Sequence, residues 1–306
     1  MSQKESIRDV DVAGKRVFVR VDFNVPIHGG KITDDTRIRA AVPTIRYLIE
    51  HRAAVILASH LGRPKGEIRE DMRLAPVAAR LGEILGLHVQ LAPDSVGAET
   101  SALARALEPG EVLMLENVRF HPEEEVNEVG YARGLADLAD LYVDDAFGSA
   151  HRAHASTEGI THFLPSVAGL LMERELSALS SVIDAPARPL VAIIGGAKIS
   201  SKIGVLTNLL DVADTFLIGG GMANTLLKAQ GHEVGDSLIE QDNLDEARSF
   251  LDTAHARIRQ VVLPLDVVVV QEVSADAARK TVPVGDVESG WKIVDIGPAT
   301  VKAFAD

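Results

Sequence analysis

The stretch VFVRVDFN, residues 17–24, joins a run of mostly apolar, β-branched residues to a polar end that carries Asp22 and Asn24. Similar runs recur along the chain as AAVILAS (53–59), HVQLA (88–92), EVLMLEN (111–117) and LYVDDAF (141–147). Short, nearly continuous apolar runs are typical of parallel strands that are buried on both faces of a sheet. We therefore predict a parallel sheet in this part of the chain.

The segments between these runs have a different periodicity. Stretches such as TIRYLIEHR (44–52) and LAPVAARLGEILG (74–86) repeat apolar residues at three- and four-residue spacing, which predicts amphipathic helices. The second half continues the alternation with predicted strands PLVAIIGG (189–196), DTFLIGGG (214–221), VVLPLDVVVV (261–270) and KIVDIG (292–297). Alternating strands and helices indicate an α/β protein with two doubly wound, Rossmann-like domains built on parallel sheets.

The junction between the two halves is predicted at LLMERELSALSSVIDAPARP, residues 170–189, a helical pattern that ends at a proline-containing stretch. A length of 306 residues also favours two domains, since one domain typically takes about 150 residues. We expect a first domain over residues 1–172, a hinge helix over 173–188 and a second domain over 189–306.

Composition excludes several classes of protein. The formal net charge of −13 argues against a nucleic-acid partner, because binding to a phosphate backbone depends on excess Lys and Arg. Apolar runs are too short for a membrane span, and the first residues, MSQKESIRDV, lack the apolar core of a secretory signal. The chain has no cysteine, which fits the cytoplasm. We expect a cytoplasmic protein with no membrane or nucleic-acid partner.

Polar residues follow the predicted strands of the first half. Because ligands of parallel sheets bind outside the carboxyl ends of the strands, these residues are candidates for a binding site. They are Asp22, Asn24, His60, Arg63, Arg119, His151 and Arg152, with Arg37 in the segment after the first strand. A single Arg is most often a solvated surface residue. Their recurrence at successive strand ends favours a site for a ligand with several negative charges.

Glycine-rich turns follow the strands of the second half. In IIGGAKISSKIGVL (193–206), Lys198 and Lys202 are four residues apart, which would place them on one face of a helix above its N-terminus. That arrangement predicts a phosphate cradle. The turn in IGGGMANTL (218–226) would let a flat ligand approach the backbone. Neither stretch is a Walker A motif or a GxGxxG motif.

The acidic clusters are interpreted as structural. Asp144 and Asp145 are expected to pair with nearby Arg side chains, and Glu123–Glu125 are expected to form a solvated loop. The sequence contains no catalytic-triad order, no HExxH motif and no EF-hand loop.

Several of these stretches together resemble the phosphoglycerate kinase family. The resemblance rests on RVDFNVP (20–26), SHLGRP (59–64), ENVRFH (116–121), DDAFGSAHRAHAS (144–156), GGAKISSKIGVL (195–206), GGGMANT (219–225) and LPLDVVV (263–269). It implies reversible phosphoryl transfer between 1,3-bisphosphoglycerate and ADP, which gives 3-phosphoglycerate and ATP. It also implies a monomer whose two domains close around the substrates.

The resemblance assigns roles residue by residue. The phosphoglycerate would contact Asp22, Phe23, Asn24, Arg37, His60, Leu61, Gly62, Arg63, Arg119, His151 and Arg152. The nucleotide would contact Gly196, Ala197, Lys198, Lys202, Gly219, Gly220, Gly221 and Gly297. The catalytic charge would come from Arg37, Lys198 and Lys202. Mg²⁺ would be carried with ATP or ADP, and no metal ligand is assigned in this chain.

Some features depart from the family pattern. Ser201 stands where the family commonly has Asp, and the chain stops at DIGPATVKAFAD, where the family continues with a GGGD-type loop that serves the Mg-nucleotide. The second domain is therefore expected to be incomplete. Two alternatives follow: an impaired fragment that binds phosphoglycerate and part of the nucleotide, and an unrelated scaffold that binds a sugar phosphate.

Overall fold

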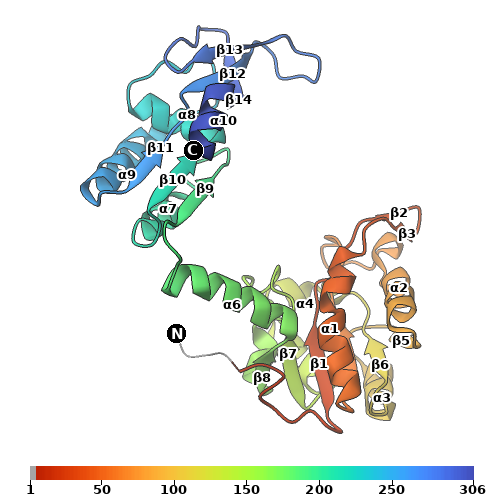
Figure 1. Cartoon of the computed structure of the whole chain (residues 1–306). Coiled ribbons are helices and arrows are strands. Elements are labelled where there is room, and N and C mark those ends of the chain that lie inside the picture. Colours follow the sequence, from red (N-terminus) through yellow and green to blue (C-terminus); the bar gives the residue numbers. More distant parts are fainter. Residues whose placement is uncertain (1–4) are drawn as a thin grey trace. The chain divides into compact units, whose positions relative to one another are not determined.

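The strand β1, Arg16–Arg20, lies in the interior of a six-stranded sheet of order β5-β6-β4-β1-β7-β8, in which neighbouring strands are parallel. The computed structural model describes residues 5–306. The stretch MSQKESIRDV, in which we expected no secretory signal, therefore lies partly outside the described residues. Two compact units divide the chain, Met1–Ser180 and Ser181–Asp306 (Figure 1).

The first unit contains all six strands of this sheet and a small hairpin. Its other strands are β2 (Ile27–His28), β3 (Lys31–Ile32), β4 (Ala54–Ala58), β5 (Val89–Leu91), β6 (Val112–Met114), β7 (Leu141–Asp144) and β8 (Ser166–Ala168). Its helices are α1 (Thr36–Glu50), α2 (Ala75–Leu85), α3 (Ala98–Ala106), α4 (Pro122–Glu125), α5 (Val129–Ala136) and the start of α6 (Leu170–Asp184), with short 3₁₀ turns η1 (Glu70–Met72), η2 (Val118–Phe120) and η3 (Gly159–His162).

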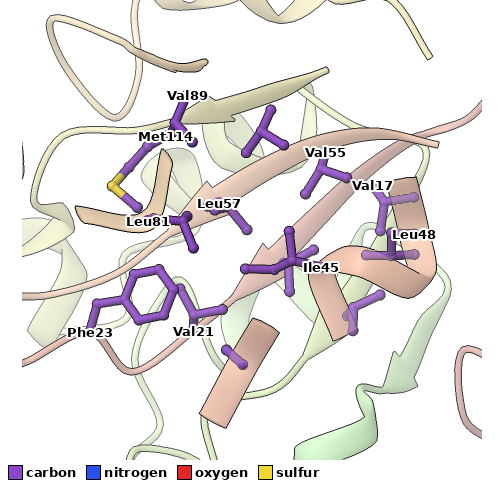
Figure 2. Close-up of a cluster of buried hydrophobic side chains, with 14 of the residues drawn as sticks. Val17, Val21, Phe23, Ile45, Leu48, Val55, Leu57, Leu81, Val89 and Met114 are labelled. Carbon is purple, nitrogen blue, oxygen red and sulfur yellow. The ribbon is translucent and has the colours of Figure 1, made fainter. Parts of the chain in front are cut away.

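Both faces of the six-stranded sheet are buried, which explains the nearly continuous apolar strands. On one face, Val17 and Val55 pack against residues of α1 and α2 such as Ile45 and Leu81, as Figure 2 shows. Phe18 lies between Val17 and Val19, whose side chains are on the first face. Its own side chain packs on the opposite face with residues of α3 and α5. Successive side chains of a strand point to opposite faces, so every residue of a doubly covered strand meets a core.

The second unit contains two three-stranded sheets. Strands β9 (Val191–Ile194), β10 (Thr215–Ile218) and β11 (Gln260–Val262) are parallel in the order β11-β10-β9. Strands β12 (Asp266–Val270), β13 (Arg279–Pro283) and β14 (Lys292–Ile296) are antiparallel in the order β13-β12-β14. The helices are α7 (Ile203–Leu209), α8 (Gly220–Ala229), α9 (Leu244–Ala256) and α10 (Pro298–Ala305), with the turn η4 (Gln241–Asn243).

The predicted α/β fold with a parallel-sheet core is confirmed, but one strand prediction is wrong. The run 261–270 forms two strands in different sheets, β11 and β12, with Pro264 between them. Proline has no backbone N–H to donate to a ladder, so the first strand ends before it. The antiparallel pairing of β12 was not expected, because its apolar residues resemble those of a parallel strand.

Helix α6 covers most of the stretch expected to join the two domains, and the division between the compact units falls inside it. The expected limits at residues 172 and 188 stay a prediction. Helix α1 begins eight residues before the predicted segment 44–52, and Pro43 lies inside it. Among residues 5–306, we find no helix with the length and apolar character needed to cross a membrane.

Candidate functional site

Four adjacent strands of the first unit bring their polar ends to one cavity of about 260 Å³. The segments after β1, β4, β6 and β7 all reach it, since the carboxyl ends of parallel strands lie at the same edge of a sheet. The lining residues are Asp22, Asn24, Arg37, His60, Gly62, Arg63, Arg119, Gly148, Ser149 and Arg152. The cavity therefore gathers four arginines that come from segments far apart in the sequence.

Hydrogen bonds between the strand-end segments hold the lining in place. The Asn24 Oδ1 atom accepts a bond of 2.9 Å from the Gly62 N–H, and Arg119 Nη1 donates to the Gly62 carbonyl at 3.0 Å. Arg37 Nη1 lies 2.6 Å from Asp22 Oδ2. Asp22 thus orients Arg37, and Asn24 holds the Gly62 backbone to which Arg119 bonds. The arginines offer paired N–H donors that suit a carboxylate or a phosphate.

His60 lies in the cavity wall above a buried arginine. Arg20 is 1% exposed and its Nη2 atom lies 3.2 Å from His60 Nδ1. A guanidinium only donates hydrogen bonds, so His60 Nδ1 accepts and the proton of the neutral ring is on Nε2. Burial and the nearby arginines lower the pKa of His60 to about 2. His60 is therefore an uncharged donor beside the arginines.

Glu124 compensates the buried charge of Arg20, contrary to the solvated loop expected for residues 123–125. Glu124 is fully buried in α4 and accepts bonds from the Ser156 hydroxyl at 2.6 Å and the Ser156 N–H at 2.9 Å. Arg20 Nε donates to the same Ser156 hydroxyl at 2.8 Å. Burial raises the pKa of Glu124, and the charge of Arg20 opposes that shift. A charge network thus lies directly beneath the cavity.

The remaining residues predicted to contact phosphoglycerate differ in position. The side chains of Phe23 and Leu61 are buried in the hydrophobic core, so only their backbone groups belong to the strand-end segments. His151 is exposed and is not part of the cavity lining, although its neighbour Arg152 is.

Asp145 contacts the start of α6 instead of an arginine, so the expected pairing with Arg is wrong. Its Oδ1 atom accepts bonds from the N–H groups of Leu171 at 2.9 Å and Met172 at 3.3 Å. Its neighbour Asp144 accepts from the Ala146 N–H at 2.9 Å. The first N–H groups of a helix have no partner within the helix, which explains why a carboxylate is placed there.

The second unit contains a pocket of about 370 Å³ between its glycine-rich turns and its antiparallel sheet. The lining residues are Gly196, Ala197, Gly220, Gly221, Ala223, Asn224, Leu238, Pro264, Val267, Ile293, Val294, Asp295 and Ile296. The mostly apolar wall and the exposed backbone suit a flat, partly apolar ligand. Four of the residues predicted to contact the nucleotide, Gly196, Ala197, Gly220 and Gly221, therefore lie together.

The glycines of the two turns are required by contact between the turns themselves. Gly220 has a φ of +69°, and a Cβ atom there would meet the Gly196 carbonyl oxygen at 3.0 Å. A Cβ atom on Gly221 would meet the Ala197 carbonyl oxygen at 2.8 Å. Glycine is therefore needed to let the two backbones approach, whether or not a ligand is bound.

Lys198 and Lys202 do not share a helical face. Helix α7 begins at Ile203, so both lysines lie in the exposed turn that precedes it. The Gly-Gly turn after β9 delays the start of the helix. Neither lysine lines the pocket, nor do Gly219 and Gly297.

Sequence reasoning missed several residues of this pocket. Asn224 is one helical turn after the glycines, in the quoted stretch GGGMANT, and could have been found from that spacing. Pro264 lies in the quoted stretch LPLDVVV, whereas Leu238 and Asp295 come from segments that are distant in sequence and carry none of the quoted motifs.

Comparison with known proteins decides the family. A family model described as phosphoglycerate kinase matches residues 7–306. The chain belongs to the phosphoglycerate kinase family. Phosphoglycerate kinases from Roseiflexus castenholzii and Moorella thermoacetica are 61% and 56% identical to it over 305 and 302 residues, which is 99% of this chain and 77% of each relative. The alternative of an unrelated sugar-phosphate scaffold is therefore wrong.

Solved structures of the phosphoglycerate kinase family have the same fold. The enzyme from Coxiella burnetii superposes with a TM-score of 0.88 at 42% identity, covering 99% of this chain and 76% of the other. The enzyme from Pyrococcus horikoshii superposes with a TM-score of 0.79 at 31% identity, covering 98% and 77%.

Phosphoglycerate kinases use a Mg-nucleotide, and we tested whether this chain offers a site for the ion. Residues 5–306 contain no group of three or more His, Asp or Glu side chains that could hold a metal. Asp295 is the single acidic residue in the described lining of the glycine-rich pocket. Mg²⁺ usually binds one or two carboxylates together with substrate phosphates. The described residues therefore form no dedicated site for the ion.

Proposed function

We propose that this chain catalyses reversible phosphoryl transfer from 1,3-bisphosphoglycerate to ADP, giving 3-phosphoglycerate and ATP. The observation that carries the proposal is the arginine-lined cavity, which gathers four cations around the polar groups of Asp22 and Asn24. A small ligand with a carboxylate and a phosphate matches this lining in charge and in hydrogen bonding. The glycine-rich pocket of the second unit is proposed to hold the nucleotide base.

Positioning and charge stabilisation supply most of the catalysis in phosphoryl transfer, and no covalent intermediate is needed. In the proposed mechanism, Arg63, Arg119 and Arg152 hold the phosphoglycerate, while neutral His60 donates from Nε2. Arg37, Lys198 and Lys202 neutralise charge on the transferring group. The substrates would bind to different domains, so we further propose that α6 acts as the hinge that brings them together and excludes water.

The decisive experiment measures turnover and binding on the same 306-residue chain. A coupled assay would follow ADP formation from 3-phosphoglycerate and Mg-ATP, and calorimetry would follow 3-phosphoglycerate binding. Sustained turnover supports the enzyme. Binding without turnover supports the alternative of an impaired fragment. Absence of binding to 3-phosphoglycerate would overturn both.

Single substitutions test the cavity itself. Arg37→Ala and Arg152→Ala are expected to weaken 3-phosphoglycerate binding at least tenfold, because a hydrogen bond to a charged group contributes about 1.5–3 kcal/mol. Arg105→Ala is the matched control, since Arg105 lies at the end of α3 and bonds to the Ser101 carbonyl instead of lining the cavity. Equal losses in all three variants would contradict the proposed site.

A further inference from the structure

The turn between β9 and α7 carries Lys198 and Lys202, and its internal hydrogen bonds are local, since the N–H groups of Lys202 and Ile203 both donate to the Ile199 carbonyl at 2.8 Å. Gly195 and Gly196 precede it, and Lys198, Ser200, Ser201 and Lys202 are exposed. Ile199 is buried in the core of the unit and anchors the turn at one point. A lysine side chain is flexible and carries a compact charge. The backbone position of the turn therefore decides which region the ammonium groups of Lys198 and Lys202 can reach.

Glu240 binds this turn from a distant segment of the chain. Its Oε2 atom accepts a bond of 2.9 Å from the Ser200 N–H, and its Oε1 atom accepts a bond of 2.6 Å from the Ser200 hydroxyl. These bonds lower the pKa of Glu240, and the charge of Lys198 adds to the shift. Hydrogen bonds to an ionised carboxylate are stronger than those between neutral groups.

Glu240 is itself fixed to the wall of the glycine-rich pocket. Its N–H donates to the Thr225 hydroxyl at 3.2 Å, and Thr225 is buried in α8. Two residues before it, Leu238 lines the pocket and accepts a bond of 3.4 Å from Asn224 Nδ2. One short segment therefore connects the pocket wall to the lysine-bearing turn, and all of these contacts lie within the second unit.

We propose that Glu240 is a positioning residue that holds the Lys198–Lys202 turn in register with the glycine-rich pocket, so that the lysines meet the phosphates of a bound nucleotide. The inference rests on the proposed function. Glu240 acts through Ser200 and touches no ligand. The negative charge of Glu240 repels phosphates. If Glu240 acts only through its charge, removal of that charge should tighten nucleotide binding; if Glu240 positions the turn, removal should weaken it.

The test compares Mg-ADP binding by calorimetry in the wild-type chain and in Glu240→Gln. Positioning predicts affinity about tenfold weaker, since Gln is uncharged and offers an NH₂ donor in place of one of the two carboxylate acceptors. Simple electrostatics predicts tighter binding, because a negative charge near two lysines is removed. Unchanged or tighter binding overturns the inference. Glu233→Gln is the control, since Glu233 belongs to the same unit, is exposed and pairs with Lys228 at 3.2 Å.

Hydrogen exchange supplies a readout that does not depend on the nucleotide. Backbone amides of residues 197–203 should exchange faster in Glu240→Gln than in the wild type, and unchanged exchange overturns the inference. Ser200→Ala loses the hydroxyl bond but keeps the N–H bond to Glu240, so both measurements should change less than in Glu240→Gln. Ser200→Thr keeps a hydroxyl group and should bind Mg-ADP as the wild type does. The serine variants also serve if Glu240→Gln does not fold.

Wild-type binding separates this inference from the proposed function. If the wild-type chain binds Mg-ADP and the Glu240 variant binds equally well, only the positioning role fails. If the wild-type chain binds no Mg-ADP, the proposed function fails and the positioning role fails with it.

Discussion

Arg20 shows how a single buried residue can set the state of its neighbour. The guanidinium holds His60 in the tautomer that presents an Nε2 proton, and Glu124 balances the charge through Ser156. A buried cation without a compensating carboxylate would be strongly unfavourable. The arginine-lined cavity thus depends on residues that line no part of it.

His60 should make stability depend on pH. Its folded pKa of about 2 lies far below the ordinary value of 6.5, so in mild acid the unfolded chain binds a proton that the folded chain does not. Stability from the neutral ring is therefore present above pH 6.5 and lost as pH falls below it, by about 1.4 kcal/mol per pH unit. Urea unfolding at pH 7.5 and 5.5 should show a greater loss for the wild type than for His60→Gln. Parallel losses would contradict this account.

Helix α6 illustrates how an element depends on a residue outside it. Its first N–H groups bond to Asp145, which follows β7, and a Cβ atom on Gly169 would collide with the Asp145 carboxylate. Gly169 does not have a positive φ, so its backbone conformation does not require glycine. The close approach of the Asp145 side chain explains why glycine is needed there. The segment after β7, which also supplies residues of the arginine-lined cavity, is therefore linked to the start of α6 through this contact.

Removal of this cap should destabilise the first unit. Asp145→Ala is expected to cost about 1 kcal/mol, as loss of a helix cap usually does, which lowers the melting temperature by roughly 2–4 °C. Calorimetric melts would measure it. Gly169→Ala should be strongly destabilising in the wild type and less so beside Asp145→Ala, because the collision with the carboxylate is then removed, although the contact of 2.7 Å with the Cβ atom of residue 145 is kept. Additive effects of the two substitutions would argue against the contact.

At the scale of the whole molecule, strand β9 is the feature that bears on association between copies of the chain. It is the edge of its sheet among the described residues, and Ile193 is 79% exposed beside a half-exposed Val191. An exposed apolar edge strand is a template for pairing with another chain. Monomeric behaviour, which the family resemblance implies, therefore stays a prediction.

Substitution at this edge should reduce self-association. Ile193→Lys is expected to keep the chain monodisperse at concentrations where the wild type associates, because a charge on an edge strand opposes pairing. Light scattering over a concentration series would measure it. The melting temperature should change little, since Ile193 contributes little buried area. Association that is equal in both chains would contradict the role of β9.

Local sequence determined the alternation of strands and helices, the two-unit organisation and the strand ends that supply the arginine cavity. Apolar runs and helical periodicity depend on neighbours in sequence, and parallel strands place their carboxyl ends at one edge. The predicted positions of Asp22, Asn24 and His60 therefore fall together in one cavity.

Only the tertiary structure decided what depends on distant segments. The two parts of the run 261–270 belong to a parallel and an antiparallel sheet because of the strands that pair with them. Glu124 resembles its exposed neighbours in sequence, yet it is buried because Arg20 and Ser156 lie opposite it. Glu240 meets the lysine-bearing turn through contacts between residues forty positions apart. Burial and long-range pairing are properties of the packed chain, and no local pattern encodes them.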